Sequence, residues 1–171
     1  MVKRFHPKMC VDTIFKIDLD LLKKQGVKGI LFDIDNTLVA YATPQPDEKI
    51  IEWICKIQQK GFKVGLFSNA NKKRVELFNK KLEVYSLAKS QKPFKMGFIK
   101  ISKLMELEPN EIAMVGDQLF TDIYGGNRFG AYTIMVNPVD EYEPSFIKLK
   151  RLFEKPILRR FKKGVERGYN E

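Results

Sequence analysis

A set of acidic side chains, with a serine, an asparagine and a lysine between them, could together transfer a phosphoryl group. The set is Asp33, Asp35, Ser68, Asn69, Lys92, Asp117 and Asp122. A carboxylate can attack phosphorus once a cation screens its repulsion with the phosphate. A second carboxyl group can protonate the leaving oxygen and later activate water. We therefore expect Asp33 to act as the nucleophile, through an aspartyl-phosphate, and Asp35 as the general acid and base.

The same residue types predict a phosphate-binding cluster and a Mg²⁺ site. Hydroxyl, amide and ammonium groups can hold phosphoryl oxygens whose charge grows in the transition state. These groups belong to Ser68, Asn69 and Lys92. Clustered carboxylates repel one another unless a cation neutralises them, and Mg²⁺ prefers oxygen ligands. The predicted metal ligands are Asp33, Asp35 through its backbone carbonyl, Asp117, and Asp122 as a further or indirect ligand.

The elements that position these residues alternate between strand and helix. Short apolar runs predict strands over 27–32, 62–67, 84–88, 112–115 and 131–136. Apolar residues at helical spacing predict helices over 47–60 and 72–82, around 94–105 and from about 121 to 128. Such alternation is typical of an α/β three-layer sandwich with a five-stranded parallel, Rossmann-like sheet. The candidate residues follow strand ends, where the ligand sites of such sheets lie.

The order of these residues resembles the haloacid dehalogenase (HAD) superfamily of phosphotransferases. Asp33-x-Asp35-x-Thr37 is similar to its first motif, Ser68 to its second and Lys92 to its third. Gly116-Asp117 with Asp122 is similar to the fourth. The resemblance implies a nucleophile and an acid/base in the first motif, phosphate binding by the serine and lysine, and Mg²⁺ at the fourth. A second aspartate in the first motif implies a phosphatase.

A narrower resemblance is to the YqeG-type class IIIA HAD phosphatases, over positions 1 to about 160. It rests on Asp33-Ile34-Asp35-Asn36-Thr37-Leu38, on the opening Pro7-x-x-x-Val11-Asp12, and on Gly116-Asp117-Gln118-Leu119-Phe120-Thr121-Asp122-Ile123. This group is related to the phosphatidylglycerophosphate phosphatases. The resemblance implies an anionic phospholipid as the phosphorylated substrate.

The spacing leaves no room for a cap domain. Only the eleven residues 36–46 separate Asp35 from Asp47, and only the three residues 89–91 separate Ala88 from Lys92. We therefore expect a cap-free site that is open to solvent. Such a site admits a phosphate presented by a protein, a nucleic acid or a membrane surface, or else it awaits a lid from another subunit.

The charge of the chain points to anionic partners. Lys and Arg number 31 against 21 Asp and Glu, a formal net charge of +10. The segment from Lys72 to Lys103 contains ten basic residues and only two acidic ones, so it is either a solvated surface or an anion-steering face.

We divide the chain into a phosphatase domain over 1–144, with its N-terminal arm, and a basic segment over 145–171. Apolar residues of the second segment recur three and four apart, which predicts an amphipathic helix that lies on a membrane or packs on the sheet.

The sequence is compatible with three functions. The first is a Mg²⁺-dependent phosphatase acting on phosphatidylglycerophosphate at a membrane surface, and the second is a soluble phosphatase for a phosphoprotein, a nucleic-acid end or a sugar phosphate. The third, a basic nucleic-acid-binding module, would not direct Asp33 and Asp35 at phosphates, so nucleic acid is not the expected partner.

No apolar stretch reaches the length of a membrane span and no signal peptide is evident, so we expect a cytoplasmic protein, peripheral on the inner face of the membrane. The oligomeric state is not predicted.

Overall fold

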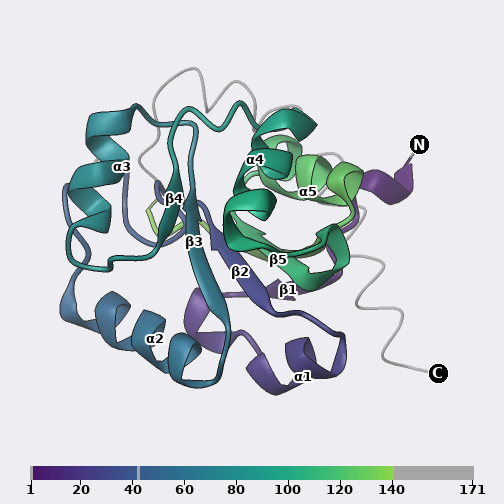
Figure 1. The fold of residues 1–171 in the computed structure, drawn as a ribbon, viewed down its shortest axis with the longest axis horizontal. Helices are drawn as coiled ribbons and strands as arrows, with labels where there is room; N and C mark the ends of the chain where they lie inside the picture. The colour runs from purple at the N-terminus through teal and green to yellow at the C-terminus, as the bar shows by residue number, and fades with distance from the viewer. Residues whose placement is uncertain (1, 42, 141–171) are drawn as a thin grey trace. The chain divides into compact units, whose positions relative to one another are not determined.

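A parallel β-sheet of six strands forms the centre of the computed structural model, which describes residues 2–41 and 43–140 (Figure 1). In sheet order the strands are β1 (Met9–Val11), β6 (Tyr132–Val136), β5 (Ile112–Gly116), β2 (Gly29–Phe32), β3 (Lys63–Phe67) and β4 (Tyr85–Leu87). All five pairings between neighbouring strands are parallel. The α/β class and the parallel sheet predicted from the sequence are confirmed. The segment 145–171, for which the sequence predicts an amphipathic helix, lies outside the described residues.

The sheet has one strand more than the five that the sequence predicts. The additional strand is β1, which pairs with β6 at the edge of the sheet. Its three residues are partly or fully exposed, so no buried apolar run identifies it. Tertiary pairing forms this strand, beginning with the Lys8 amide, which donates to the Thr133 carbonyl at 2.9 Å.

Helices cover both faces of the sheet, which makes the three layers visible in Figure 1. On one face lie α1 (Leu19–Lys24), α2 (Glu48–Gln59) and α3 (Lys72–Asn79), and on the other lie α4 (Lys95–Met105) and α5 (Tyr124–Phe129). Alternation along β2 explains why there are two cores. Ile30 and Phe32 are buried among the residues of α1, α2 and α3, whereas Leu31 is buried with those of α4.

Side-chain capping sets the ends of two helices. Asp47 accepts a hydrogen bond from the Ile50 amide at 2.9 Å, which caps α2 where the sequence predicts its start. Helix α3 ends at Asn79, earlier than the predicted end at residue 82. The Asn79 side chain forms two hydrogen bonds with the backbone of Val84, at 2.7 and 3.1 Å. These bonds stabilise a turn in which Glu83 has a φ of 51°, so the helix cannot continue.

The order in which the chain adds strands to the sheet changes direction at β2. Strands β3 and β4 follow on one side of β2, whereas β5 and β6 lie on the other. In parallel sheets such a switch point leaves a crevice at the carboxyl ends of the two central strands. The loops that leave β2 and β5, which contain Asp33 and Asp117, therefore meet at the place expected for a ligand.

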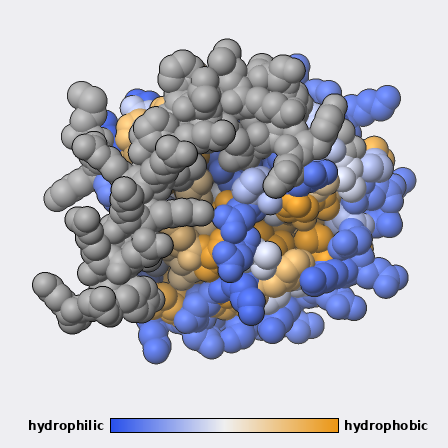
Figure 2. Space-filling view, turned by 180° about the vertical axis from the view of Figure 1, so that it is seen from behind, coloured by the Kyte–Doolittle hydropathy of each residue, from blue (hydrophilic) through white to orange (hydrophobic). Residues whose placement is uncertain are grey.

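The described residues contain no inserted cap. Residues 33–47 connect β2 to α2, and residues 88–94 connect β4 to α4. Within the same part of the chain, no helix is both long and apolar enough to cross a membrane. Seen from behind relative to Figure 1, apolar residues reach the surface, and hydrophilic residues lie below them and to their right (Figure 2).

Candidate active site

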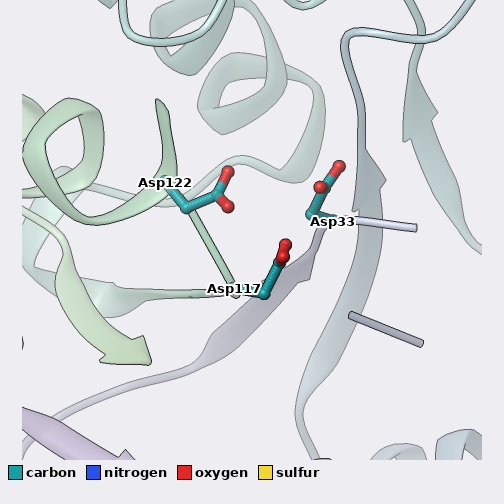
Figure 3. Close-up of side chains that lie close together, drawn as sticks. All are labelled: Asp33, Asp117 and Asp122. Carbon is teal, nitrogen blue, oxygen red and sulfur yellow. The ribbon is translucent and has the colours of Figure 1, made fainter. Parts of the chain in front are cut away.

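Three carboxylates meet at the carboxyl edge of the sheet. Asp33 directly follows β2, Asp117 directly follows β5, and Asp122 lies in the π-helical turn Leu119–Ile123 that leads into α5. One oxygen atom from each carboxylate lies within 4.8 Å of an oxygen of the others. Figure 3 shows the three side chains gathered around one space. All three are buried, and Asp117 and Asp122 have no exposed area.

Lys92 provides a positive charge within this cluster. Its ammonium nitrogen lies 2.9 Å from Oδ1 of Asp33 and 2.7 Å from Oδ1 of Asp122, and its side chain is 2% exposed. Burial disfavours the charged ammonium, but the carboxylates of Asp122 and Asp33 outweigh burial and raise the pKa of Lys92 above its usual value. The ammonium therefore stays protonated and holds the loop after β4 against the loop after β2.

The ammonium of Lys92 offsets only part of the negative charge of the three carboxylates. Burial raises the pKa of Asp33 to about 6, and the neighbouring charge of Asp122 adds to that effect, although Lys92 opposes it. Three carboxylates share the space with one ammonium among the described residues. The cluster therefore favours an additional cation.

Asn69 positions Lys92 through the backbone. Its Oδ1 accepts hydrogen bonds from the Lys92 amide at 2.9 Å and from the Ser90 hydroxyl at 2.8 Å. Its Nδ2 donates to the Lys92 carbonyl at 3.1 Å. Ser68, immediately before Asn69, is 2% exposed, and its hydroxyl oxygen accepts from the Ala70 amide at 3.1 Å. The side-chain amide of Asn69 thus orients the lysine, and phosphate binding by Asn69 stays a prediction.

Thr37 and Gly116 bring the β2 and β5 loops together. The Thr37 hydroxyl donates to Oδ1 of Asp117 at 3.2 Å and accepts from the Asp117 amide at 3.1 Å. Gly116 allows the Asp122 carboxylate to approach the end of β5, because a Cβ atom at position 116 would overlap Oδ2 of Asp122. The Gln118 amide donates to the same Oδ2 at 3.1 Å. These contacts orient both acidic residues that follow β5.

Asp35 lies outside the carboxylate cluster and is paired with Arg74. Its Oδ1 is 3.0 Å from Nη2 of Arg74, and the two side chains are 17% and 14% exposed. From the sequence, Arg74 is only one of the ten basic residues between Lys72 and Lys103, with no role of its own. The two residues are 39 positions apart, and no local signal marks them as partners. The structure therefore brings Asp33, Lys92, Asp117 and Asp122 together and places Asp35 beside an arginine.

Comparison with known proteins identifies the family. A family model described as mitochondrial PGP phosphatase matches residues 2–140. The chain belongs to this family. It is 38% identical over 164 residues to the probable phosphatase YqeG of Bacillus subtilis (strain 168), and the match covers 95% of each chain. The resemblance to HAD phosphatases of the YqeG type is confirmed, and this chain is a phosphoric monoester hydrolase.

Two further relatives extend the comparison. The chain is 31% identical to phosphatidylglycerophosphate phosphatase 1, chloroplastic/mitochondrial, of Arabidopsis thaliana, over 94% of this chain and 49% of that protein. This chain thus spans about half of the plant enzyme. The crystal structure of a HAD phosphatase from Thermococcus onnurineus superimposes with a TM-score of 0.53 at 17% identity, covering 70% of this chain and 90% of that one. That likeness supports the fold.

The charge balance of the cluster predicts that Lys92→Met destabilises the protein strongly. Removing the ammonium leaves buried carboxylates without their partner, a change that costs about 3–5 kcal/mol in buried ion pairs. We expect that loss in the free energy of unfolding, measured by urea denaturation at pH 7 in EDTA. Lys95→Met, at an exposed position on α4, is the matched control and should change the free energy by less than about 0.5 kcal/mol.

Asp33→Asn is the complementary variant. It removes one of three like charges and leaves the ion pair between Lys92 and Asp122, so we expect a smaller loss than in Lys92→Met. Equal free energies of unfolding for Lys92→Met and Lys95→Met would show that the Lys92 ammonium does not stabilise the buried carboxylates.

Proposed function

We propose that this phosphatase hydrolyses its phosphomonoester through an aspartyl-phosphate on Asp33, with Mg²⁺ as cofactor. The observation that carries the proposal is the position of the Lys92 ammonium. It lies between Asp33 and Asp122 at the switch point of the sheet, where a phosphoryl group attacked by Asp33 would place its oxygens. A buried cation at that point stabilises charge that develops on the phosphoryl oxygens.

The chemistry of the donor set fits Mg²⁺. Asp33 and Asp117 offer carboxylate oxygens in a buried space with excess negative charge, and Mg²⁺ prefers such hard oxygen ligands. Asp122 already receives hydrogen-bond or ion-pair contacts at both carboxylate oxygens, from Lys92 and from the Gln118 amide. These contacts favour Asp122 as a further or indirect ligand, with the Asp35 carbonyl completing the protein's donors. When bound, Mg²⁺ screens the repulsion between Asp33 and the phosphate.

Each chemical step can be assigned to a residue of this chain. A carboxylate oxygen of Asp33 forms a bond to phosphorus as the bond from phosphorus to the ester oxygen breaks. Asp35, in its protonated form, donates its proton to that oxygen, and the alcohol leaves. Asp35 then takes a proton from water, whose oxygen attacks phosphorus, so that phosphate leaves and Asp33 is regenerated. Lys92 and Ser68 hold the phosphoryl oxygens throughout.

Asp33→Asn should abolish phosphate release and phosphoenzyme formation, because an amide is a poor nucleophile. Asp35→Asn should be slowed by about 10²–10⁴-fold, the usual loss for a general acid and base. The measurement is phosphate release from a confirmed substrate, together with acid-quench trapping of a phosphoenzyme that hydroxylamine cleaves, as expected for an acyl phosphate. Near-normal hydrolysis by Asp33→Asn would contradict the aspartyl-phosphate mechanism.

Binding of Mg²⁺ should raise the melting temperature of the wild-type protein without any substrate. A ligand at a hundred times its Kd stabilises the folded state by about 2.7 kcal/mol. Asp117→Asn should weaken this shift markedly, because it removes a carboxylate ligand. Asp20→Asn is the control, because Asp20 is exposed, pairs with Lys60 and is not a member of the carboxylate cluster. An unchanged shift in Asp117→Asn would place the metal elsewhere.

For the substrate, we propose phosphatidylglycerophosphate at a membrane surface. The names of the family and of the Arabidopsis relative support this lipid, and a site without a cap among the described residues suits a headgroup held in a bilayer. The α4 outer face adds a structural argument. It consists of Phe94, Lys95, Met96, Ile99, Lys100, Lys103 and Leu104, all exposed. Helix α4 itself contains no acidic residue.

The α4 outer face combines the two features that bind anionic membranes. Phe94 and Met96 are 63% and 57% exposed, and they follow the buried Lys92 almost directly in the chain. Apolar side chains of this kind insert at a membrane interface, and anionic lipid attracts each nearby lysine by about 1 kcal/mol. Contact through this face would bring the membrane close to the mouth of the site. The segment 145–171 stays a second predicted contact.

Phosphatidylglycerophosphate should release phosphate faster than sugar phosphates, nucleotides or phosphopeptides in the presence of Mg²⁺, and EDTA should stop the reaction. The double variant Phe94→Ala/Met96→Ala should lose activity on this lipid in anionic vesicles and keep it on a soluble short-chain form. Leu77→Ala, at an exposed position of α3, is the control.

Two results would contradict the substrate proposal separately. Turnover of a sugar phosphate, nucleotide or phosphopeptide without turnover of the lipid would leave the chemistry standing and change the substrate. Equal activity of wild type and the double variant on vesicles would remove the α4 outer face from the membrane contact. Deletion of residues 145–171 tests the second contact in the same assay.

A further inference from the structure

Arg74 is the second cation that the structure places at the site, and the mechanism above does not use it. Its guanidinium pairs with Asp35, the residue that would protonate the leaving oxygen. Lys72 and Lys73, its neighbours on α3, are exposed, and Lys72 pairs with Glu76 on the same helix. Arg74 thus differs from the other basic residues at the start of α3, which form an ordinary solvated surface.

Contacts with the loop between β2 and α2 and with α3 itself hold Arg74 in place. The Arg74 amide lies in the capped first turn of α3, where it donates to Oδ1 of Asn71 at 2.9 Å. Nη1 donates to the Pro44 carbonyl at 3.3 Å, and Cζ lies 5.2 Å from the centre of the buried Phe78 ring. Nε is buried and has no acceptor among the described residues. The position of this charge is therefore set by the fold before any substrate arrives.

The neighbourhood of Asp35 decides what this charge can recognise. The leaving oxygen must come within hydrogen-bonding distance of the Asp35 carboxyl group, so the atoms attached to that oxygen come close to Arg74. A guanidinium presents paired donors that match a phosphate group, and it keeps its charge at every physiological pH. The ion pair is partly exposed, so an incoming anion can reach the guanidinium.

We propose that Arg74 recognises a second anionic group on the leaving side of the substrate, a phosphodiester a few atoms from the scissile oxygen. The inference rests on the proposed function, which places Asp35 at that oxygen. In phosphatidylglycerophosphate the three carbons of one glycerol separate the phosphomonoester from the phosphodiester. When the phosphodiester takes over contacts of the guanidinium, the Asp35 carboxyl group is released towards the leaving oxygen. A monoester without the second anion leaves Arg74 on Asp35.

The test compares two soluble phosphomonoesters, namely short-chain phosphatidylglycerophosphate, which has the second anion, and glycerol 3-phosphate, which lacks the whole phosphatidyl group. Wild-type enzyme should prefer the first. Arg74→Gln should lower kcat/KM for it by about 10- to 100-fold, with a rise in KM, as expected for loss of a charged hydrogen bond. Activity on glycerol 3-phosphate should change by less than about threefold in either direction, because this substrate has no phosphodiester for Arg74 to bind. Arg74→Lys keeps the charge without the paired donors, so it should restore part of the preference.

Lys73→Gln is the matched control from the next position of α3 and should leave both substrates unchanged. A melting curve for each variant confirms that it is folded, and Arg74→Lys provides a milder change should Arg74→Gln unfold. Equal losses on both substrates, or no preference in the wild type, would overturn the role of Arg74 and leave the aspartyl-phosphate mechanism standing. Failure of the wild type to hydrolyse either substrate would overturn the proposed function and this inference together.

Discussion

The balance of buried charge at the carboxyl edge of the sheet is the constraint on which the rest of the site depends. Three carboxylates and one ammonium share a space almost without solvent, and the pKa of Asp33 rises because the lysine does not offset the burial. Holding such a cluster together requires rigid support. Asn69 binds the backbone around Lys92, and Thr37 binds Asp117 from across the β2–β5 boundary. The same excess of negative charge that destabilises the cluster makes it suitable for a divalent cation.

The topology of the sheet supplies that support. Because the strand order reverses at β2, the loops after β2 and β5 leave their strands side by side, and the loop after β4 reaches them with Lys92. Buried strands on both sides keep these loop starts in register, as shown by the Asp33 amide, which donates to the Val115 carbonyl at 3.0 Å. Under the proposed mechanism, a nucleophile anchored in this way would keep a constant position relative to the lysine, which favours catalysis by orientation.

Selection of the substrate has few structural elements to draw on, because the described residues include no cap. Two features near the mouth of the site can contribute. Arg74 lies beside Asp35 and would select by charge on the leaving group, whereas the α4 outer face would select by bringing the site to an anionic surface. The two act at different stages, since the first concerns the bound substrate and the second concerns where the enzyme lies. The basic residues between Lys72 and Lys103 therefore have distinct environments. Lys92 is buried in the carboxylate cluster, Arg74 is paired with Asp35, and the lysines of the α4 outer face are exposed.

The sequence by itself determined the fold class, five of the six strands and the residues gathered around Asp33. These follow from local patterns: buried strands are apolar runs, and parallel strands bring the residues at their ends to one edge. Three features were decided only by the tertiary structure. Strand β1 exists through its pairing with β6, the amide of Asn69 is committed to the Lys92 backbone, and Asp35 pairs with Arg74. In each case the partner lies between 23 and 125 positions away, and no local propensity encodes a contact whose energy arises only when the chain has folded.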